Sequence, residues 1–389
     1  MPFTQNDDAA VVARQLGPQI RAARQEAEEL RQTPPALANA ITKAGLYQMY
    51  LPRSAGGPEM SPLTVFSAIE ELSKADGSVS WSVMIATVLS FFTGWLTPNV
   101  TRGMCGDPAD LRMAGSLRPQ GRAWPVDGGY RVNGQWNFAS GIRNANWLHC
   151  TCMVMDGEKP EITAADTPRV RVVWVPAAEA TIKDTWSVIG MRGTGSQDFT
   201  VEDLFVPKER THFAGDPPVE KGPLYQPRGL FMNLFATVAA NSLGIARAAI
   251  DDFVQIATQE GSTQSPTLLR DRAFVQSRVA EAEAMLNASR AYLIDALGRA
   301  WAAQCAQVAD PTPEIVQARL ATTHAMHETV RAVDLVFRAA GTNAIYTCSP
   351  LERHFRDIHV AIQHNAGFPV HYESAGKVLM GLRPSEPGW

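Results

Sequence analysis

The chain has 389 residues, of which 45% are hydrophobic and 19% are charged, so it can bury a large core and form two or three domains. Its formal net charge of −4 excludes the strongly basic surface of a nucleic-acid-binding protein. Five scattered cysteines do not suggest a disulfide framework, and the acidic residues near the start are unlike a signal peptide. We therefore expect a soluble, cytoplasmic protein.

Residues 1–110 carry a helical pattern, in which Ala, Arg, Glu and Gln recur at amphipathic spacing between breaks at Pro and Gly. The predicted helices span residues 9–31, 36–44 and 61–74. A further apolar run, residues 83–96, is interrupted by Thr, Ser and Gly. It is too short and too polar to cross a bilayer, so it predicts a buried helix.

Residues 111–220 change to short β-rich runs separated by turn sequences, which predicts a compact β domain. The runs span residues 130–132, 147–155, 170–175 and 199–205. Residues 127–129 and 133–134 are the predicted turns. Cys150 and Cys152 share one face of a predicted strand, and no second pair of ligands with zinc spacing accompanies them.

Residues 221–389 are helical again, and four segments joined by short breaks predict a helix bundle. The segments span residues 232–259, 266–305 and 313–340, with a last one from 351. The fold class is thus α+β, mostly α: an N-terminal helical domain (1–110), a central β domain (111–220) and a C-terminal four-helix bundle (221–389). His324 and His327 lie three apart on a helix without a carboxylate partner, so no metal site is predicted.

Four sequence blocks, in the right order, resemble the acyl-CoA dehydrogenase superfamily over nearly the whole chain. They lie at residues 45–78, 133–147, 190–207 and 341–357. The second block contains Asn-Gly-Gln-Trp-Asn-Phe-Ala-Ser-Gly, the third begins Gly-Met-Arg-Gly-Thr-Gly-Ser, and the fourth ends on an Arg-Asp pair. The resemblance implies the acyl-CoA dehydrogenase fold, with a flavin between the β domain and the bundle.

Three departures separate this chain from the dehydrogenases of that family. Nine residues after Arg356, where many dehydrogenases carry the catalytic glutamate, stands Asn365, which cannot abstract a proton. Residues 114–119, Ala-Gly-Ser-Leu-Arg-Pro, replace a Thr-Glu-Pro signature. Residues 259–264 replace the Arg-x-x-x-Phe-Gly motif that holds the flavin pyrophosphate, which implies that flavin is not bound permanently.

The departures resemble the oxygenase branch of the superfamily, the two-component flavin-dependent monooxygenases of group D. Its members take reduced FMN or FAD from a separate NAD(P)H:flavin reductase and hydroxylate phenols, indoles, thiophenes or amines through a flavin C4a-hydroperoxide. In that branch a histidine follows the Arg-Asp pair, as His364 does here. The resemblance implies a monooxygenase of a small aromatic molecule, assembled as a homotetramer.

The same resemblance assigns roles to individual residues. Ser140 matches the hydroxyl that faces flavin N5, and His364 is the expected base or proton shuttle, so these two are the predicted catalytic residues. The predicted cofactor-binding residues are Phe138, Ala139, Ser140, Trp186, Arg192, Thr194 and Ser196. The predicted substrate pocket contains Phe91, Phe92 and Asn365. Trp136 is expected on the same strand face as Phe138.

Two other interpretations stay open. A true acyl-CoA dehydrogenase with a displaced base would hold FAD tightly and be reduced by an acyl-CoA. A catalytically idle scaffold would bind neither oxidised nor reduced flavin. Retention of Phe138, Ser140 and the hydroxyls at 194 and 196 favours a flavin enzyme.

Overall fold

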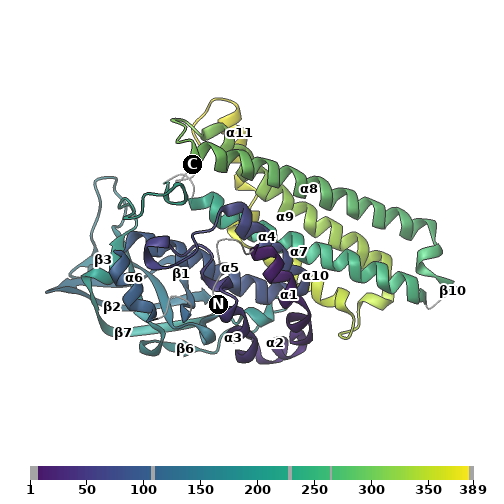
Figure 1. Ribbon diagram of the computed structural model, residues 1–389, viewed down its shortest axis with the longest axis horizontal. Coiled ribbons are helices and arrows are strands. Elements are labelled where there is room, and N and C mark those ends of the chain that lie inside the picture. The colour runs from purple at the N-terminus through teal and green to yellow at the C-terminus, as the bar shows by residue number, and fades with distance from the viewer. Residues whose placement is uncertain (1–7, 107–109, 227–229, 263–264, 385–389) are drawn as a thin grey trace.

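The computed structural model describes residues 8–106, 110–226, 230–262 and 265–384. Figure 1 shows the β-sheet at one end, the N-terminal helices beside it and the long helices of the C-terminal half extending to the other end. The predicted order of helical, β and helical regions is therefore present, and the predicted fold class is confirmed.

Six helices form the N-terminal region: α1 (Ala9–Ala22), α2 (Arg24–Leu30), α3 (Pro35–Lys43), α4 (Pro62–Ala75), α5 (Gly77–Phe91) and α6 (Pro98–Cys105). Local capping explains where two of them begin. The Ser61 hydroxyl accepts from Thr64 N–H at 3.2 Å, and the Asp76 carboxylate accepts from Val79 N–H at 2.9 Å. The sequence predicts one helix over residues 9–31, but the structure has two. Helix α1 ends at Ala22, and α2 begins at Arg24.

Helix α5 runs through the centre of the molecule. Within the described residues, Gly77–Trp95 is the one helical stretch long and apolar enough to cross a membrane, yet 83% of its apolar window is buried in the fold. That burial is typical of a core helix, as the sequence predicts.

The β domain contains β1 (Met113–Val126), β2 (Gly129–Ala139), β3 (Trp147–Asp156), β4 (Lys159–Pro160), β5 (Val170–Pro176), β6 (Thr181–Lys183), β7 (Gln197–Pro207) and β8 (Thr211–Phe213). The sheet order is β6-β7-β2-β1-β3-β5-β8, with β4 paired to β3, and β1 and β3 run parallel. The turn predicted at residues 133–134 is wrong. Asn133 and Gly134 lie inside β2, where the pairing with β7 shifts register.

The C-terminal half contains α7 (Leu230–Gln259), α8 (Ala273–Cys305), α9 (Thr312–Ala340), α10 (Pro350–Ala361) and α11 (Val370–Leu379). The helix predicted from residue 266 begins later, because the short strands β9 (Gly261–Ser262) and β10 (Ser265–Leu268) precede it. The predicted last helix also breaks after Ala361. His364, expected in a helix, therefore lies in a turn between α10 and α11.

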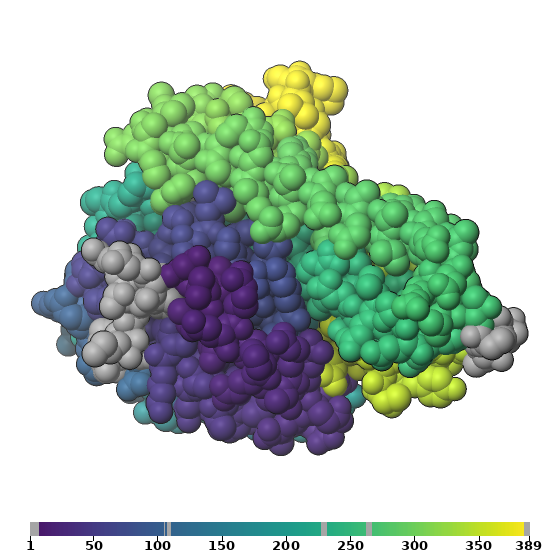
Figure 2. All heavy atoms as spheres, turned by 45° about the vertical axis from the view of Figure 1, so that its right-hand side comes forward, coloured from purple at the N-terminus to yellow at the C-terminus, as the bar shows by residue number. Residues whose placement is uncertain are grey.

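One large hydrophobic core joins the N-terminal helices to the bundle, while a smaller core fills one face of the sheet. Polar contacts reinforce the junction between the N-terminal helices and the bundle. Asn241 on α7 donates to the Gly77 carbonyl at 2.9 Å, and Arg290 on α8 pairs with Glu70 on α4 at 2.6 Å. Figure 2 shows the N-terminal segment (purple) lying between the β region (blue) and the bundle (green).

Candidate functional site

The end of β2 presents Phe138 to solvent. Its pairing with β7 shifts register between Trp136 and Ala139, and Phe138 adopts a left-handed φ of 61°. As a result Trp136 points into the β core, stacked on Phe199 at 5.1 Å, whereas Phe138 is 53% exposed. The expectation that both share one face is therefore wrong, and Phe138 offers a half-exposed aromatic ring. Ala139, between Phe138 and Ser140, is buried.

Three buried hydroxyls connect the turn that follows Phe138 to the loop before β7. The Ser140 hydroxyl is 2.7 Å from that of Ser196, which is 2.7 Å from that of Thr194. Thr194 donates to the carbonyl of Met191 at 2.9 Å. Gly141 N–H donates to the Thr194 carbonyl at 2.8 Å, so the turn after β2 and the loop before β7 form one unit. The structure thus brings three of the predicted cofactor-binding residues together.

Trp186 and Arg192 flank this unit on different sides. The Trp186 ring meets Phe138 edge-on at 6.1 Å, and its Nε1–H donates to the Met191 carbonyl at 3.2 Å. Arg192 lies 3.9 Å from the carboxylate of Glu28 on α2. Trp186 therefore borders the Phe138 ring, while part of the Arg192 charge is already balanced within the protein.

His364 lies at the start of a short 3₁₀ turn, Asn365–Gly367. Its Nδ1 accepts from Ala366 N–H at 3.2 Å, and its ring meets Trp81 at 5.6 Å and Phe235 at 6.1 Å. Burial lowers the pKa of His364 to about 4, and the charge of Arg118 adds to that effect. The imidazole is therefore neutral at pH 7.

The contact with Ala366 also selects the tautomer. Because Nδ1 accepts a hydrogen bond, the neutral His364 ring carries its proton on Nε2. Within the described residues Nε2 has no hydrogen-bond partner, so it remains available as a donor. The sequence predicts a base or proton shuttle at His364, whereas this arrangement offers a hydrogen-bond donor at Nε2, because Nε2 cannot accept a proton without a change of tautomer.

Arg118 is a site residue that the sequence reasoning missed. Four residues of β1, 117–120, loop out between Ser116 and Gly121, opposite a single residue of β3. The Arg118 guanidinium consequently lies 5.2 Å from the Phe138 ring centroid. In the described part of the chain, the Arg118 side chain forms no ion pair. The only sequence signal was its place within residues 114–119, where the Thr-Glu-Pro signature is lost.

Phe91 and Phe92 are not brought to His364. Phe91, the last residue of α5, follows Trp81 by about 15 Å along the helix axis, and Phe92 comes directly after it. Phe91 is stacked on Tyr225 at 5.2 Å, and Phe92 lies 5.1 Å from the ring of His149, in a separate buried aromatic cluster. The predicted substrate pocket of Phe91, Phe92 and Asn365 stays a prediction, because the two rings pack in this cluster and not against His364. Trp81 and Phe235, which sequence reasoning missed, cover His364 instead.

Asn365 directly follows His364, with an exposed side chain, and its carbonyl accepts from His371 Nε2 at 2.8 Å. The two histidines on α9 also have other partners. His327 Nε2 lies 3.0 Å from the Gly367 carbonyl, and His324 packs near Tyr292. No group of three or more His, Cys, Asp or Glu side chains able to hold a metal occurs in the described ranges.

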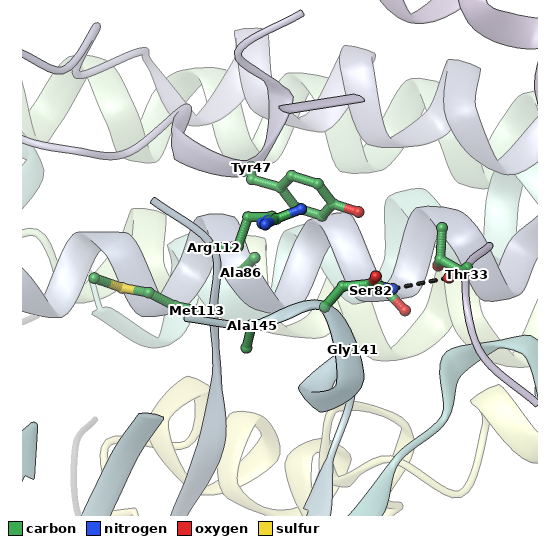
Figure 3. Close-up of a pocket in the computed structure, with 9 residues that line it drawn as sticks. Thr33, Tyr47, Ser82, Ala86, Arg112, Met113, Gly141 and Ala145 are labelled. Carbon is green, nitrogen blue, oxygen red and sulfur yellow. Dashed lines mark hydrogen bonds between the residues drawn. The ribbon is translucent and has the colours of Figure 1, made fainter. Parts of the chain in front are cut away.

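A small pocket backs onto the Ser140 turn from the side of α5 (Figure 3). Its lining comprises Thr33, Tyr47, Ser82, Ala86, Arg112, Met113, Gly141, Asn144 and Ala145. Asn144 closes one side by donating to the Thr33 carbonyl at 2.8 Å, and Ser82 reaches the Thr194 carbonyl at 3.5 Å. Phe138 and Arg118 do not line this pocket and are both exposed, so the candidate site is an open face.

That open face fits a flavin. An exposed aromatic ring, the edge of Trp186 and a buried hydroxyl at Ser140 match a planar ring system with a polar N5, and Arg118 offers a positive charge that has no ion-pair partner among the described residues. The pyrophosphate motif is lost in residues 259–264. Residues 263–264 of this segment lie outside the described residues.

Two family models match the chain. "Acyl-CoA dehydrogenase, N-terminal domain" covers residues 7–94, and "Acyl-CoA dehydrogenase, C-terminal domain" covers residues 236–367. Two relatives extend the likeness. An indole-3-acetate monooxygenase of Pseudomonas putida is 32% identical over 355 residues, 90% of this chain and 88% of the relative. The flavin-dependent monooxygenase oxygenase subunit HsaA of Mycobacterium tuberculosis is 29% identical over 398 residues, 98% of each.

Solved structures agree with the sequence relatives. The 3-HSA hydroxylase from Rhodococcus sp. RHA1 has a TM-score of 0.88 at 26% identity and covers 99% of both chains. XiaF from Streptomyces sp., in complex with FADH2 and glycerol, has a TM-score of 0.88 at 25% identity and covers 97% of this chain and 96% of its own. The resemblance predicted from the four sequence blocks is confirmed. This chain belongs to the acyl-CoA dehydrogenase superfamily and, within it, to the flavin-dependent monooxygenases.

Proposed function

We propose that this protein is the oxygenase component of a two-component system that hydroxylates a small aromatic carboxylate of the arylacetate class. The observation that carries the substrate class is Arg118, whose guanidinium lies 5.2 Å from the Phe138 ring without an ion-pair partner among the described residues. A carboxylate is the natural ligand of such a guanidinium. The name of a relative, indole-3-acetate monooxygenase, supports the same class.

Reduced FMN or FAD bound on the Phe138 face supplies the electrons that activate O2, so that one oxygen atom enters the substrate and the other leaves as water. The chain's own residues hold and shield the reactants. Phe138 and Trp186 support the ring, and Ser140 contacts N5. Thr194 and Ser196 hold Ser140, while Trp81 and Phe235 keep water from the imidazole of His364.

His364 acts as a hydrogen-bond donor of the site. It is neutral at physiological pH and carries its proton on Nε2, so it can donate a hydrogen bond to an oxygen that gains charge during the transfer. The asparagine at 365, in place of the dehydrogenases' catalytic glutamate, leaves no carboxylate base at that position and argues against acyl-CoA oxidation.

The proposal includes partners and assembly. The names of two relatives contain the words "oxygenase subunit" and "oxygenase component", which supports a separate NAD(P)H:flavin reductase. We propose that both proteins lie in the cytoplasm. A homotetramer is proposed by family likeness, and exposed apolar side chains on the bundle, such as Phe274 on α8, are compatible with it. Sedimentation velocity of the purified chain tests the assembly.

The decisive experiment supplies chemically reduced FMN or FAD to the protein with isotopically labelled O2 and an arylacetate such as indole-3-acetate. A hydroxylated product carrying one labelled oxygen, and none without the protein, is the expected result. Reduction of protein-bound FAD by an acyl-CoA under anaerobic conditions, with no labelled product, would assign the protein to the dehydrogenases instead.

A further inference from the structure

The hydroxyls of Ser140, Ser196 and Thr194 form a continuous chain that ends on a backbone carbonyl. Ser140 to Ser196 and Ser196 to Thr194 are both 2.7 Å, and Thr194 to the Met191 carbonyl is 2.9 Å. All three side chains are buried, with exposures of 3%, 4% and 1% for Ser140, Ser196 and Thr194. Water therefore does not replace these contacts.

The carbonyl fixes the direction of every hydrogen bond in this chain. A carbonyl only accepts, and a hydroxyl has a single proton, so Thr194 must donate its proton to the Met191 carbonyl. Ser196 must then donate to Thr194, and Ser140 must donate to Ser196. Ser140 is left with lone pairs alone for any further hydrogen-bond partner.

The Met191 peptide is itself held in place from two other directions. Its N–H donates to the Asp357 carboxylate at 2.5 Å, and its carbonyl also accepts from Trp186 Nε1 at 3.2 Å. The carbonyl therefore cannot rotate away to release the Thr194 proton without breaking both contacts. The direction of the hydroxyl chain is built into the fold.

We propose that this hydroxyl chain makes Ser140 an obligate hydrogen-bond acceptor, which selects reduced flavin over oxidised flavin. Reduced flavin carries a hydrogen on N5, whereas oxidised flavin presents N5 as an acceptor. The N5–H of reduced flavin can donate to a lone pair of Ser140. The N5 lone pair of oxidised flavin would face another lone pair, so no hydrogen bond could form. The inference rests on the proposed function, in which Ser140 contacts N5.

Selection of this kind meets a need of an enzyme that draws its flavin from solution. Such an enzyme must capture the reduced form in the presence of the oxidised form and release the oxidised form after turnover. Leaving a buried acceptor unmatched weakens binding, and we expect the hydroxyl chain to contribute about a tenfold preference for reduced flavin.

The test measures the dissociation constants of oxidised and reduced FMN and FAD, the latter under anaerobic conditions, for the wild type and three variants. Thr194→Val leaves Ser196 without its acceptor, so Ser196 can donate to Ser140 and free the Ser140 proton for oxidised N5. Ser196→Ala frees it directly. Thr194→Ser, the matched control, keeps the hydroxyl and the direction of the chain.

We expect both Thr194→Val and Ser196→Ala to reduce the preference for reduced flavin about tenfold, while Thr194→Ser retains it. The two-electron potential of bound flavin should fall by about 30 mV for each tenfold loss. An unchanged preference in a folded Thr194→Val or Ser196→Ala protein overturns this inference while leaving the proposed function intact. Failure of the wild type to bind either flavin overturns the proposed function itself, and the inference with it.

Discussion

The carboxylate of Asp357, on α10, accepts a hydrogen bond from the backbone N–H of Met191 at 2.5 Å. This contact joins the C-terminal bundle to the loop that carries Thr194 and Ser196. On the same helix, Arg356 pairs with Glu28 on α2 at 2.8 Å. The Arg-Asp pair therefore positions α10 through different partners on either side, rather than through a bond within the pair.

Asp357→Asn tests the electrostatic cost of this contact. Burial, together with the neighbouring Asp76, raises the pKa of Asp357 from its usual 3.8 to about 7. Between pH 4 and 7, Asp357 is therefore protonated in the folded protein but ionised in the unfolded chain. The contribution of this proton to the free energy of unfolding is lost as the pH rises through 7. Asparagine can accept the same hydrogen bond without the charge.

We expect Asp357→Asn to be more stable than the wild type at pH 8, by on the order of 1–3 kcal/mol, and close to it at pH 4.5. Urea unfolding at both pH values measures the difference. A variant that loses more stability at pH 8 than at pH 4.5 would show that the ionised carboxylate is favourable here.

His364 should act as a hydrogen-bond donor, and two substitutions separate that role from the role of a base. The amide of glutamine offers an N–H but no basic lone pair. If donation matters, His364→Gln keeps more activity than His364→Ala, which we expect to lose about 100-fold in kcat. Equal losses in both variants, measured as product formed per reduced flavin, would favour the base.

The acidity of the same group predicts a pH profile. Because the pKa of His364 is lowered to about 4, its neutral form persists until the pH falls through 4. Protonation of His364 should therefore cause no change in product formation by the wild type between pH 6 and 7.5. An acidic limb of kcat near pH 6.5 that disappears in His364→Gln would contradict the assigned pKa.

Arg118→Met should discriminate between charged and neutral substrates. The variant removes the guanidinium and keeps an apolar side chain of similar length, so we expect KM for an arylacetate to rise about 10- to 100-fold. KM for the corresponding amide should change little. Arg122→Met is the matched control, since Arg122 is an exposed arginine on the same strand. Parallel losses with both substrates would assign Arg118 to flavin binding instead.

Local rules explain which parts of this fold the sequence could predict. The helix predicted over residues 61–74 is present as α4, because its cap at Ser61 and the proline at its first position act over a few residues. The predicted turn at Asn133 and Gly134 failed, because pairing with β7 on one side and β1 on the other overrides a local turn preference.

The site residues that sequence reasoning missed depend on contacts between distant segments. Arg118 reaches Phe138 only because β1 loops out by several residues, an irregularity that no residue pattern marks. Trp81 rather than Phe91 meets His364 because α5 passes the site near its beginning. Helix phase and strand register become visible only when the elements are packed together.

Trp136 and Phe138 form a natural pair for separating stability from flavin binding. Trp136 is fully buried and its Nε1–H donates to the Thr151 carbonyl at 2.8 Å, so Trp136→Ala should cost about 3–5 kcal/mol of unfolding free energy. Phe138 is 53% exposed, and Phe138→Ala should change stability by less than about 1 kcal/mol.

Reduced-flavin affinity should respond in a different way. Phe138→Ala removes the ring on which the flavin would stack, and stacking on an aromatic side chain contributes about 1–3 kcal/mol, so we expect affinity to fall about 10-fold or more. Thermal unfolding and anaerobic flavin titration measure the two properties separately. If Phe138→Ala bound reduced flavin as tightly as the wild type, the exposed ring would have no role in flavin binding, and the flavin would have to lie elsewhere on the β domain.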